Sequence, residues 1–342
     1  MALLLLESFD ALAEVSDKYS TDTANVTTSA TQARTGTLSM LIDGTTSTFV
    51  YFPVLTATRT NEIYVGFAIY LTGYPGLDGY SAIRFIGDSI AGAFLVIQDD
   101  GELAVGGSTL QEYSGANKLS LNTWYYIEIK MIKSNSSSAG DVIVKVDGVE
   151  WINCDAGRDF LSGSYAWTDC VAFRGYAGAD RYIDDLYICD ETGAQNNTFL
   201  GQLKIATLYP SEDGNQNDFV GSDADSIDNF LLVDEATDDG DTTYVESDTP
   251  TEVDLYTMDN MPAASSSIVG VQVCSYMRTD AVGSRLARHV ARVSTTDYEG
   301  ADMGVNYAYM WGVTTWELNP GDSAAWEDAD IDAVEFGIKV EA

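Results

Sequence analysis

Two adjacent carboxylates, Asp184 and Asp185, interrupt an apolar run in RYIDDLYICD (181–190). The flanking Tyr, Ile and Leu residues are typical of a β-strand. Neighbouring carboxylates can hold a metal ion, serve as an acid–base pair in catalysis, or form the internal hydrogen bonds that a fold requires. The residues of this stretch by themselves leave the three alternatives open.

A second oxygen-rich stretch, DGNQND (213–218), suggests a site for a cation. Asp213, Asn215 and Asn217 alternate there like the first ligands of an EF-hand loop. The glycine position of such a loop holds Asp218 and its twelfth position holds Ala224, so the stretch is not an EF-hand. Oxygen ligands suit hard cations. Ca²⁺ at this acidic, loop-like run is therefore one alternative, a solvated acidic loop is the other, and we expect that no cofactor is required.

Aromatic residues among glycines and serines suggest contact with a sugar. The flat face of an aromatic ring can stack against sugar C–H groups in a binding site that a few polar groups complete. The alternative for each ring is partial burial or a subunit interface. The candidate residues are Tyr74 and Tyr80 in GYPGLDGY (73–80), and Tyr165 and Trp167 in SGSYAWTD (162–169).

Hydrolytic chemistry finds little support in the sequence. A retaining glycosidase needs two carboxylates about 5 Å apart that face the sugar, and the acids of this chain lie mostly in expected turns. His289 is the single histidine, and no G-x-S-x-G elbow is present. We expect no catalytic residue and no enzymatic activity.

Charge and composition exclude several classes of partner. The 342 residues carry a formal net charge of −36, which repels nucleic acid phosphates. Four cysteines without a CxxC pair predict neither a disulfide framework nor a zinc site. No apolar stretch approaches a membrane span, and MALLLLESFD at the start reads as a first strand rather than an export signal. We expect synthesis in the cytoplasm and no membrane insertion.

Strand-like patterns extend over nearly the whole chain. In YYIEIKMI, Tyr126, Glu128 and Lys130 alternate with Ile127, Ile129 and Met131, which are on the expected core side. RLARHVARV (285–293) fits a helix or a strand, and its flanking residues favour a strand. The pattern breaks near residue 200. We therefore predict an all-β protein of two tandem, jelly-roll-like β-sandwich domains, residues 1–200 and 201–342.

The first half resembles a concanavalin A-like, laminin-G-type jelly roll in the order of its strands. The matching pieces are LLLLESFD, WYYIEIKM (124–131), VIVKVDGVEW (142–151) and YIDDLYICD (182–190). The resemblance implies that Asp184 is a structural acid that binds backbone N–H groups or an arginine such as Arg174 or Arg181. Since strand side chains alternate, Asp185 is expected on the opposite face of the sheet.

The second half resembles C-terminal domains of tailed-bacteriophage virion proteins, through DDGDTTYVES (238–247) and the stretches 265–293 and 297–340. The resemblance implies a structural protein on the virion surface. We expect a tail-associated adhesin or fibre component that binds a host-surface glycan, works as a homo-oligomer and contacts other virion proteins. The alternatives are a capsid decoration or head-fibre protein and, third, a glycan-degrading enzyme. The sequence does not separate head from tail.

Overall fold

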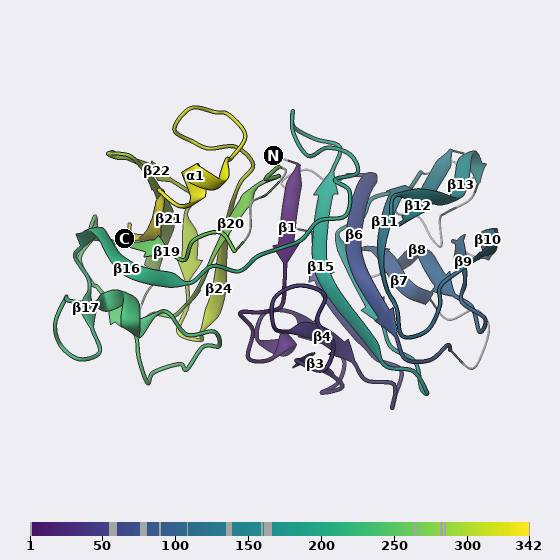
Figure 1. Cartoon of the computed structure of the whole chain (residues 1–342), viewed down its shortest axis with the longest axis horizontal. Helices are drawn as coiled ribbons and strands as arrows, with labels where there is room; N and C mark the ends of the chain where they lie inside the picture. Colours follow the sequence, from purple (N-terminus) through teal and green to yellow (C-terminus); the bar gives the residue numbers. More distant parts are fainter. Residues whose placement is uncertain are drawn as a thin grey trace. The chain divides into compact units, whose positions relative to one another are not determined.

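The chain is built almost entirely from β-strands, and its all-β fold class is confirmed (Figure 1). The computed structural model describes residues 2–54, 60–75, 81–88, 90–107, 109–134, 139–158, 160, 166–262, 265, 267–280, 283 and 285–341. The chain divides into two compact units. Unit 1 comprises Met1–Asp10 and Glu14–Ile205, and unit 2 comprises Ala11–Ala13 and Ala206–Ala342.

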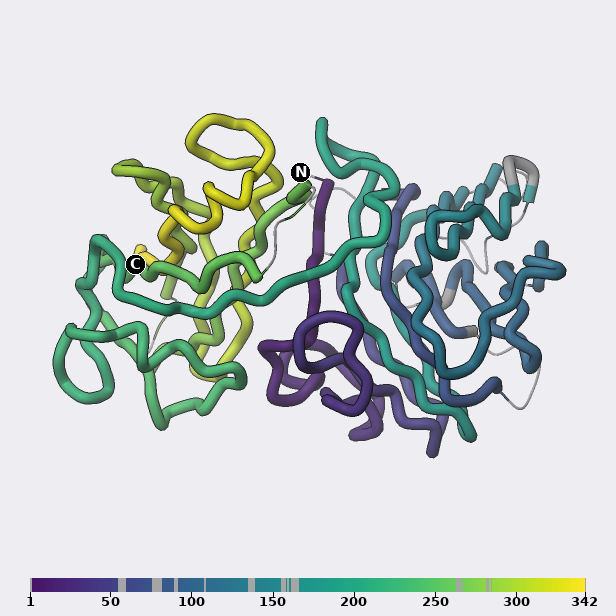
Figure 2. Tube along the Cα trace, viewed as in Figure 1, coloured from purple at the N-terminus to yellow at the C-terminus, as the bar shows by residue number. Residues whose placement is uncertain are grey.

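Unit 1 contains an antiparallel sheet of eight strands. In sheet order they are β13 (Val149–Arg158), β12 (Gly140–Val146), β11 (Trp124–Ile132), β6 (Glu62–Leu71), β15 (Arg181–Asp190), β4 (Ser39–Ile42) and β3 (Val26–Ser29), and β1 (Leu3–Glu7) also pairs with β15. Figure 2 shows the N-terminal strand in purple beside the teal β15, although more than 170 residues separate them along the chain.

A second sheet of unit 1 has seven strands. Their order is β10 (Leu110–Lys118), β9 (Glu102–Gly106), β8 (Ile90–Ile97), β7 (Ser81–Gly87), β14 (Cys170–Arg174), β5 (Phe49–Pro53) and β2 (Ser20–Thr21). A short 3₁₀ helix, η1 (Val15–Asp17), precedes β2. This arrangement makes unit 1 a β-sandwich.

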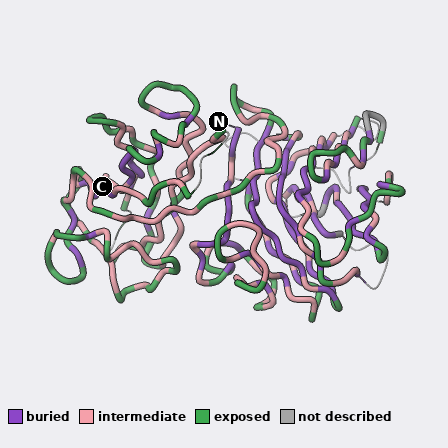
Figure 3. The backbone as a smooth tube through the Cα atoms, viewed as in Figure 1, coloured by how far each residue is buried: buried purple, intermediate pink, exposed green. Residues whose placement is uncertain are grey.

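The core of unit 1 lies between the two sheets. Ile127, Ile129 and Met131 of β11 are fully buried, as the alternation in the sequence predicted. Ile83 of β7 and Phe173 of β14 line one interior space together with Ile127. Each such side chain contributes about 1.5–3 kcal/mol through burial. Figure 3 shows buried backbone along these strands and exposed backbone in the loops.

Unit 2 contains a six-stranded sheet and two separate two-stranded sheets. The sheet contains β16 (Pro210–Asn217), β19 (Val253–Met258), β25 (Glu335–Val340), β21 (Arg285–Val293), β22 (Thr296–Glu299) and β23 (Met303–Val305). The pairs are β17 (Val220–Gly221) with β18 (Val245–Glu246), and β20 (Val271–Met277) with β24 (Met310–Trp316). Helical structure is limited to η2 (Asn229–Leu232) and α1 (Asp328–Ile331) in the described part of this unit.

RLARHVARV forms strand β21, as the sequence favoured. Its Ala287, Val290 and Ala291 are buried, and the strand pairs with β25 on one side. A small core gathers around Trp326 and Phe336. No helix among the described residues is long and apolar enough to cross a membrane.

Candidate functional site

The two carboxylates of β15 lie at a β-bulge. Asp185 has a positive φ of 50°, and the pairing with β6 shifts between Asp184 and Tyr187. The extra residue of a bulge re-aims the side chains next to it. Both carboxylates therefore reach the same loop, residues 34–35, and the prediction that Asp185 lies on the opposite face from Asp184 is wrong.

Asp184 is a buried structural acid. Its Oδ2 accepts the backbone N–H groups of Arg34 at 2.7 Å and Thr35 at 3.1 Å, and its Oδ1 accepts that of Asp185 at 2.8 Å. Asp184 is thus held by backbone N–H groups, the first of the two predicted kinds of partner, and the arginine guanidinium of this site, that of Arg34, contacts Asp185 rather than Asp184. Burial and the neighbouring Asp185 raise the pKa of Asp184 to about 7, against the opposing effect of the three N–H donors.

Asp185 joins two distant segments of unit 1. Its Oδ2 accepts the Arg34 guanidinium, while its Oδ1 accepts the Thr35 hydroxyl at 2.6 Å and the Ile205 N–H at 2.8 Å. Arg34 also donates to the Leu203 carbonyl at 2.7 Å and lies 4.9 Å from the ring centre of Tyr126.

A third buried acid, Glu128, binds the segment of unit 1 that follows β15 and that also includes Leu203 and Ile205. Glu128 accepts the Tyr187 hydroxyl at 2.7 Å and the Gly201 N–H at 2.8 Å. Phe199 packs edge-on against Tyr64, with ring centres 5.2 Å apart. The outer face of the eight-stranded sheet is thus covered in part by the chain itself, and these buried acids bind groups of unit 1.

The structure describes two of the four predicted sugar-binding aromatic residues, Tyr74 and Trp167. Tyr74 is partly buried and donates its hydroxyl to the Leu119 carbonyl at 2.6 Å. Trp167 is half-buried, and its carbonyl accepts the Lys133 ammonium at 2.6 Å. Tyr80 and Tyr165 lie outside the described residues. Sugar contact at these four positions stays a prediction.

The predicted calcium ligands lie in an edge strand, and the expectation of a loop there is wrong. The stretch forms β16, which pairs with β19 along one side. Asn217 donates to Asp213 Oδ2 at 2.9 Å, whereas Asn215 donates its backbone N–H to Glu335 at 3.0 Å. Within the described part of the chain, no three His, Cys, Asp or Glu residues form a group that could hold a metal ion. Calcium binding at this stretch stays a prediction.

His289 lies buried between two hydroxyl groups. Its Nε2 is 2.9 Å from Ser275 Oγ and its Nδ1 is 2.9 Å from Thr314 Oγ1. Burial lowers the pKa of His289 to about 4, so the ring is neutral at pH 7. A neutral imidazole held by hydroxyls satisfies its own hydrogen bonds, which is what a buried histidine in a fold requires.

The outer face of the seven-stranded sheet carries aromatic and arginine side chains in register. Tyr51 of β5 pairs with Ala172 of β14, which pairs with Arg84 of β7, which in turn pairs with Phe94 of β8. Side chains that lie directly across neighbouring strands point to the same side. The adjacent row, which includes Val50, is the buried core side. The row with Arg84 therefore faces outward, and neighbouring side chains cover the small Ala172, which is buried.

Two further side chains complete this surface. Phe49 follows the same side of β5, and its ring is 5.9 Å from that of Tyr51 at an interplanar angle of 24°. The guanidinium carbons of Arg84 and Arg174 lie 4.8 Å and 5.1 Å from the Phe49 ring centre. We name these five residues the arginine–aromatic face: Phe49, Tyr51, Arg84, Phe94 and Arg174.

The arginine–aromatic face concentrates positive charge on a strongly acidic protein. All five of its side chains are of intermediate exposure. The guanidinium groups of Arg84 and Arg174 lie near the same Phe49 ring, and burial together with the nearby Arg174 lowers the pKa of Arg84 from its usual value. Arg174 Nε donates to Ser47 at 3.0 Å, and the Tyr51 hydroxyl donates to Asp22 at 3.3 Å.

Sequence reasoning missed this face because its members are far apart in the chain. Only FVYFP (49–53) carried a local signal, since Phe49 and Tyr51 alternate with the apolar Val50 and Phe52. Arg84 and Arg174 are 90 residues apart in the sequence, and the pairing of β7 with β14 brings them together. That pairing is not readable from local pattern.

Comparison with known proteins gives no family for this chain. No family model matches, and no curated protein matches. Among solved structures, the alginate lyase Aly36B is similar at 10% identity and a TM-score of 0.36, covering 54% of this chain and 95% of the lyase. Domain 4 of AbnA, a GH43 extracellular arabinanase from Geobacillus stearothermophilus, in complex with arabinotriose, is similar at 14% identity and 0.36, covering 55% and 92%. The carbohydrate esterase vb_24B_21 from the Shiga toxin-encoding bacteriophage phi24B is similar at 12% identity and 0.36, covering 54% and 99%.

Proposed function

We propose that unit 1 is a glycan-binding module and that its arginine–aromatic face binds a sugar chain that carries carboxylate or sulfate groups. The observation that supports this most is the outward row of Tyr51, Arg84 and Phe94, with Phe49 beside two guanidinium groups. Aromatic faces offer flat apolar surface to the C–H side of a sugar ring, and guanidinium groups bind carboxylate or sulfate oxygens in pairs.

Charge decides which sugars the face selects. The net charge of −36 repels acidic polymers at long range. At physiological ionic strength this repulsion decays over about 8 Å, so the charges within the site dominate at contact. The guanidinium groups of Arg84 and Arg174 are weakly hydrated cations and lie near the apolar ring of Phe49. Both properties favour the binding of an anionic group of the ligand.

Binding without turnover is the second part of the proposal. Three buried acids of unit 1, Glu128, Asp184 and Asp185, are engaged by backbone N–H, tyrosine and arginine groups. Carboxylates held in this way are not presented to a sugar, whereas glycoside cleavage needs two that flank the bond. The expected activity is therefore retention of a glycan.

The setting that we propose is the surface of a tailed-phage virion. Support comes from the resemblance of the second half to phage virion domains, with a tail-associated adhesin or fibre component as the first choice and a capsid decoration protein as the alternative. In a homo-oligomer, several weak glycan sites act together and gain avidity. Immunogold labelling of intact particles separates head from tail.

A glycan array tests the binding proposal. The full chain should bind acidic glycans more strongly than their neutral counterparts. Arg84→Gln should weaken that binding by about tenfold or more, because a charge-assisted hydrogen bond contributes about 1.5–3 kcal/mol. Arg158→Gln is the matched control, because Arg158 is an exposed arginine of the same unit that pairs with Glu112. Equal binding by the wild type and Arg84→Gln would contradict the proposal.

A further inference from the structure

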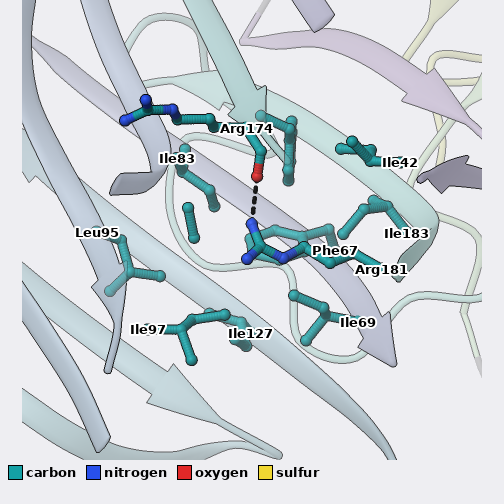
Figure 4. Close-up of a pocket in the computed structure, with 12 residues that line it drawn as sticks. Ile42, Phe67, Ile69, Ile83, Leu95, Ile97, Ile127, Arg174, Arg181 and Ile183 are labelled. Atoms are coloured by element: carbon teal, nitrogen blue, oxygen red, sulfur yellow. Dashed lines mark hydrogen bonds between the residues drawn. The ribbon is translucent and has the colours of Figure 1, made fainter. Parts of the chain in front are cut away.

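Among the described residues of unit 1, one arginine lies inside the sandwich. Arg181 is 2% exposed, and Figure 4 shows its side chain among apolar residues of both sheets. Its Nη1 donates to the Arg174 carbonyl, and its guanidinium carbon lies 3.4 Å from the ring centre of Tyr176. Burial lowers the pKa of Arg181 to about 10, which leaves it protonated at neutral pH.

Two of its three guanidinium nitrogens have no partner. Nε and Nη2 of Arg181 are buried and make no hydrogen bond within the described structure. These two atoms form the side-on edge of a guanidinium, the edge that binds anions through two parallel N–H groups. A buried charge without a counter-charge destabilises the folded state, so we expect a ligand at this edge of the guanidinium.

The arginine borders a small interior cavity. The space has room for about one particle the size of a water molecule, and apart from Arg181 and Arg174 its lining residues are apolar. Figure 4 shows Arg181 between the side chains of the two sheets that enclose this space. The aliphatic side chains that line the cavity include Ile69, Ile83, Leu95, Ile97 and Ile127.

The lining distinguishes an anion from a water molecule. A buried water molecule needs two to four polar partners, including acceptors for its two O–H groups. Arg181 supplies only donors, the aliphatic side chains of the cavity supply no acceptor, and the carbonyl of the lining residue Arg174 already accepts Arg181 Nη1. A monatomic anion only accepts hydrogen bonds, and it also neutralises the guanidinium. A carboxylate or sulfate would exceed the space.

We propose that this interior cavity binds one halide ion, chloride under ordinary conditions, against Nε and Nη2 of Arg181. The ion is then a structural ligand of unit 1, independent of the glycan face. Since a ligand that binds only the folded state stabilises it by mass action, the stability of unit 1 depends on the chloride concentration.

Hydrogen–deuterium exchange of the full chain measures this dependence. Chloride replaces gluconate at constant ionic strength and pH, and the exchange of amides in β6 and β15 is followed. Above the dissociation constant, each tenfold increase in chloride should slow their exchange through unfolding by about tenfold. Amides of β21 and β25 in unit 2 serve as the internal control and should not change.

Two variants and a second, crystallographic measurement test the chloride site further. Arg181→Met, a neutral side chain of similar shape, should abolish the chloride dependence, while the exposed Arg158→Met should keep it. Crystals grown in bromide should show an anomalous peak within hydrogen-bonding distance of Arg181 Nε and Nη2, which does not depend on the folding of any variant. Exchange rates that are equal in chloride and gluconate, or a bromide crystal without that peak, would overturn the proposal.

Discussion

Arg34→Met is the substitution that bears most directly on the role of the buried acids. It removes the guanidinium that contacts Asp185 and leaves that fully buried carboxylate with hydrogen bonds but no counter-charge. Removing one partner of a buried pair costs about 3–5 kcal/mol. The variant also loses the bond to the Leu203 carbonyl and the contact with the Tyr126 ring, so we expect the upper part of this range.

Urea unfolding of the full chain measures this loss. Because typical domains are stable by about 5–15 kcal/mol, the change should move the midpoint of unit 1 strongly. In the double variant Arg34→Met/Asp185→Asn, the buried charge is gone as well, so the two losses should not add. We expect a coupling of at least about 1.5 kcal/mol in the double-mutant cycle.

Arg158→Met is the control for the loss of an arginine from unit 1. Its ion pair with Glu112 is exposed, so its removal should cost at most about 1 kcal/mol. If Arg34→Met cost no more than this control, or if the double variant lost the full sum of the two single losses, the assignment of Asp185 to a structural ion pair would be refuted.

Two further predictions concern pH and packing. His289 has a pKa of about 4 in the folded chain against 6.5 for an ordinary histidine, so the unfolded state binds the extra proton first and unit 2 should lose about 3 kcal/mol as the pH falls from about 6.5 to 4. Urea midpoints across this pH range should therefore fall in the wild type and change less in His289→Gln; parallel profiles for the two proteins would refute the role of His289. Gly66→Ala should destabilise unit 1 by about 1–3 kcal/mol, because the new Cβ would lie 2.0 Å from Tyr187 Cε1. Gly148→Ala, in an open turn whose φ of 79° is strained for alanine but where no atom lies within 4 Å, separates the steric cost from the backbone cost, and an equal loss in both variants would contradict the packing argument.

Local pattern in the sequence identified the buried strands but not the polar edge strand β16 and not the site. The alternation around Ile127 and Ile129 identified the core side of β11, because one buried face imposes a period of two. The same rule failed at Asp185, where a bulge at positive φ turns both carboxylates to one loop. The partners that favour this bulge, Arg34 and Thr35, lie about 150 residues away in the sequence.

The polar residues of β16 led to the wrong prediction of a loop, for a related reason. An edge strand pairs on one side only and tolerates polar side chains, so DGNQND looks like a loop although it joins the sheet through β19. The arginine–aromatic face required knowledge of sheet order, since only the pairing of β7 with β14 places Arg84 near Arg174.

A crystal structure of the full chain with an acidic oligosaccharide that it retains on the array tests the central claim most directly. We expect the sugar to lie over Phe49 and Tyr51, with a carboxylate or sulfate oxygen within hydrogen-bonding distance of Arg84 or Arg174. A sugar bound instead at the predicted loop aromatics Tyr74 and Trp167, or on unit 2, would contradict the assignment of glycan binding to the seven-stranded sheet.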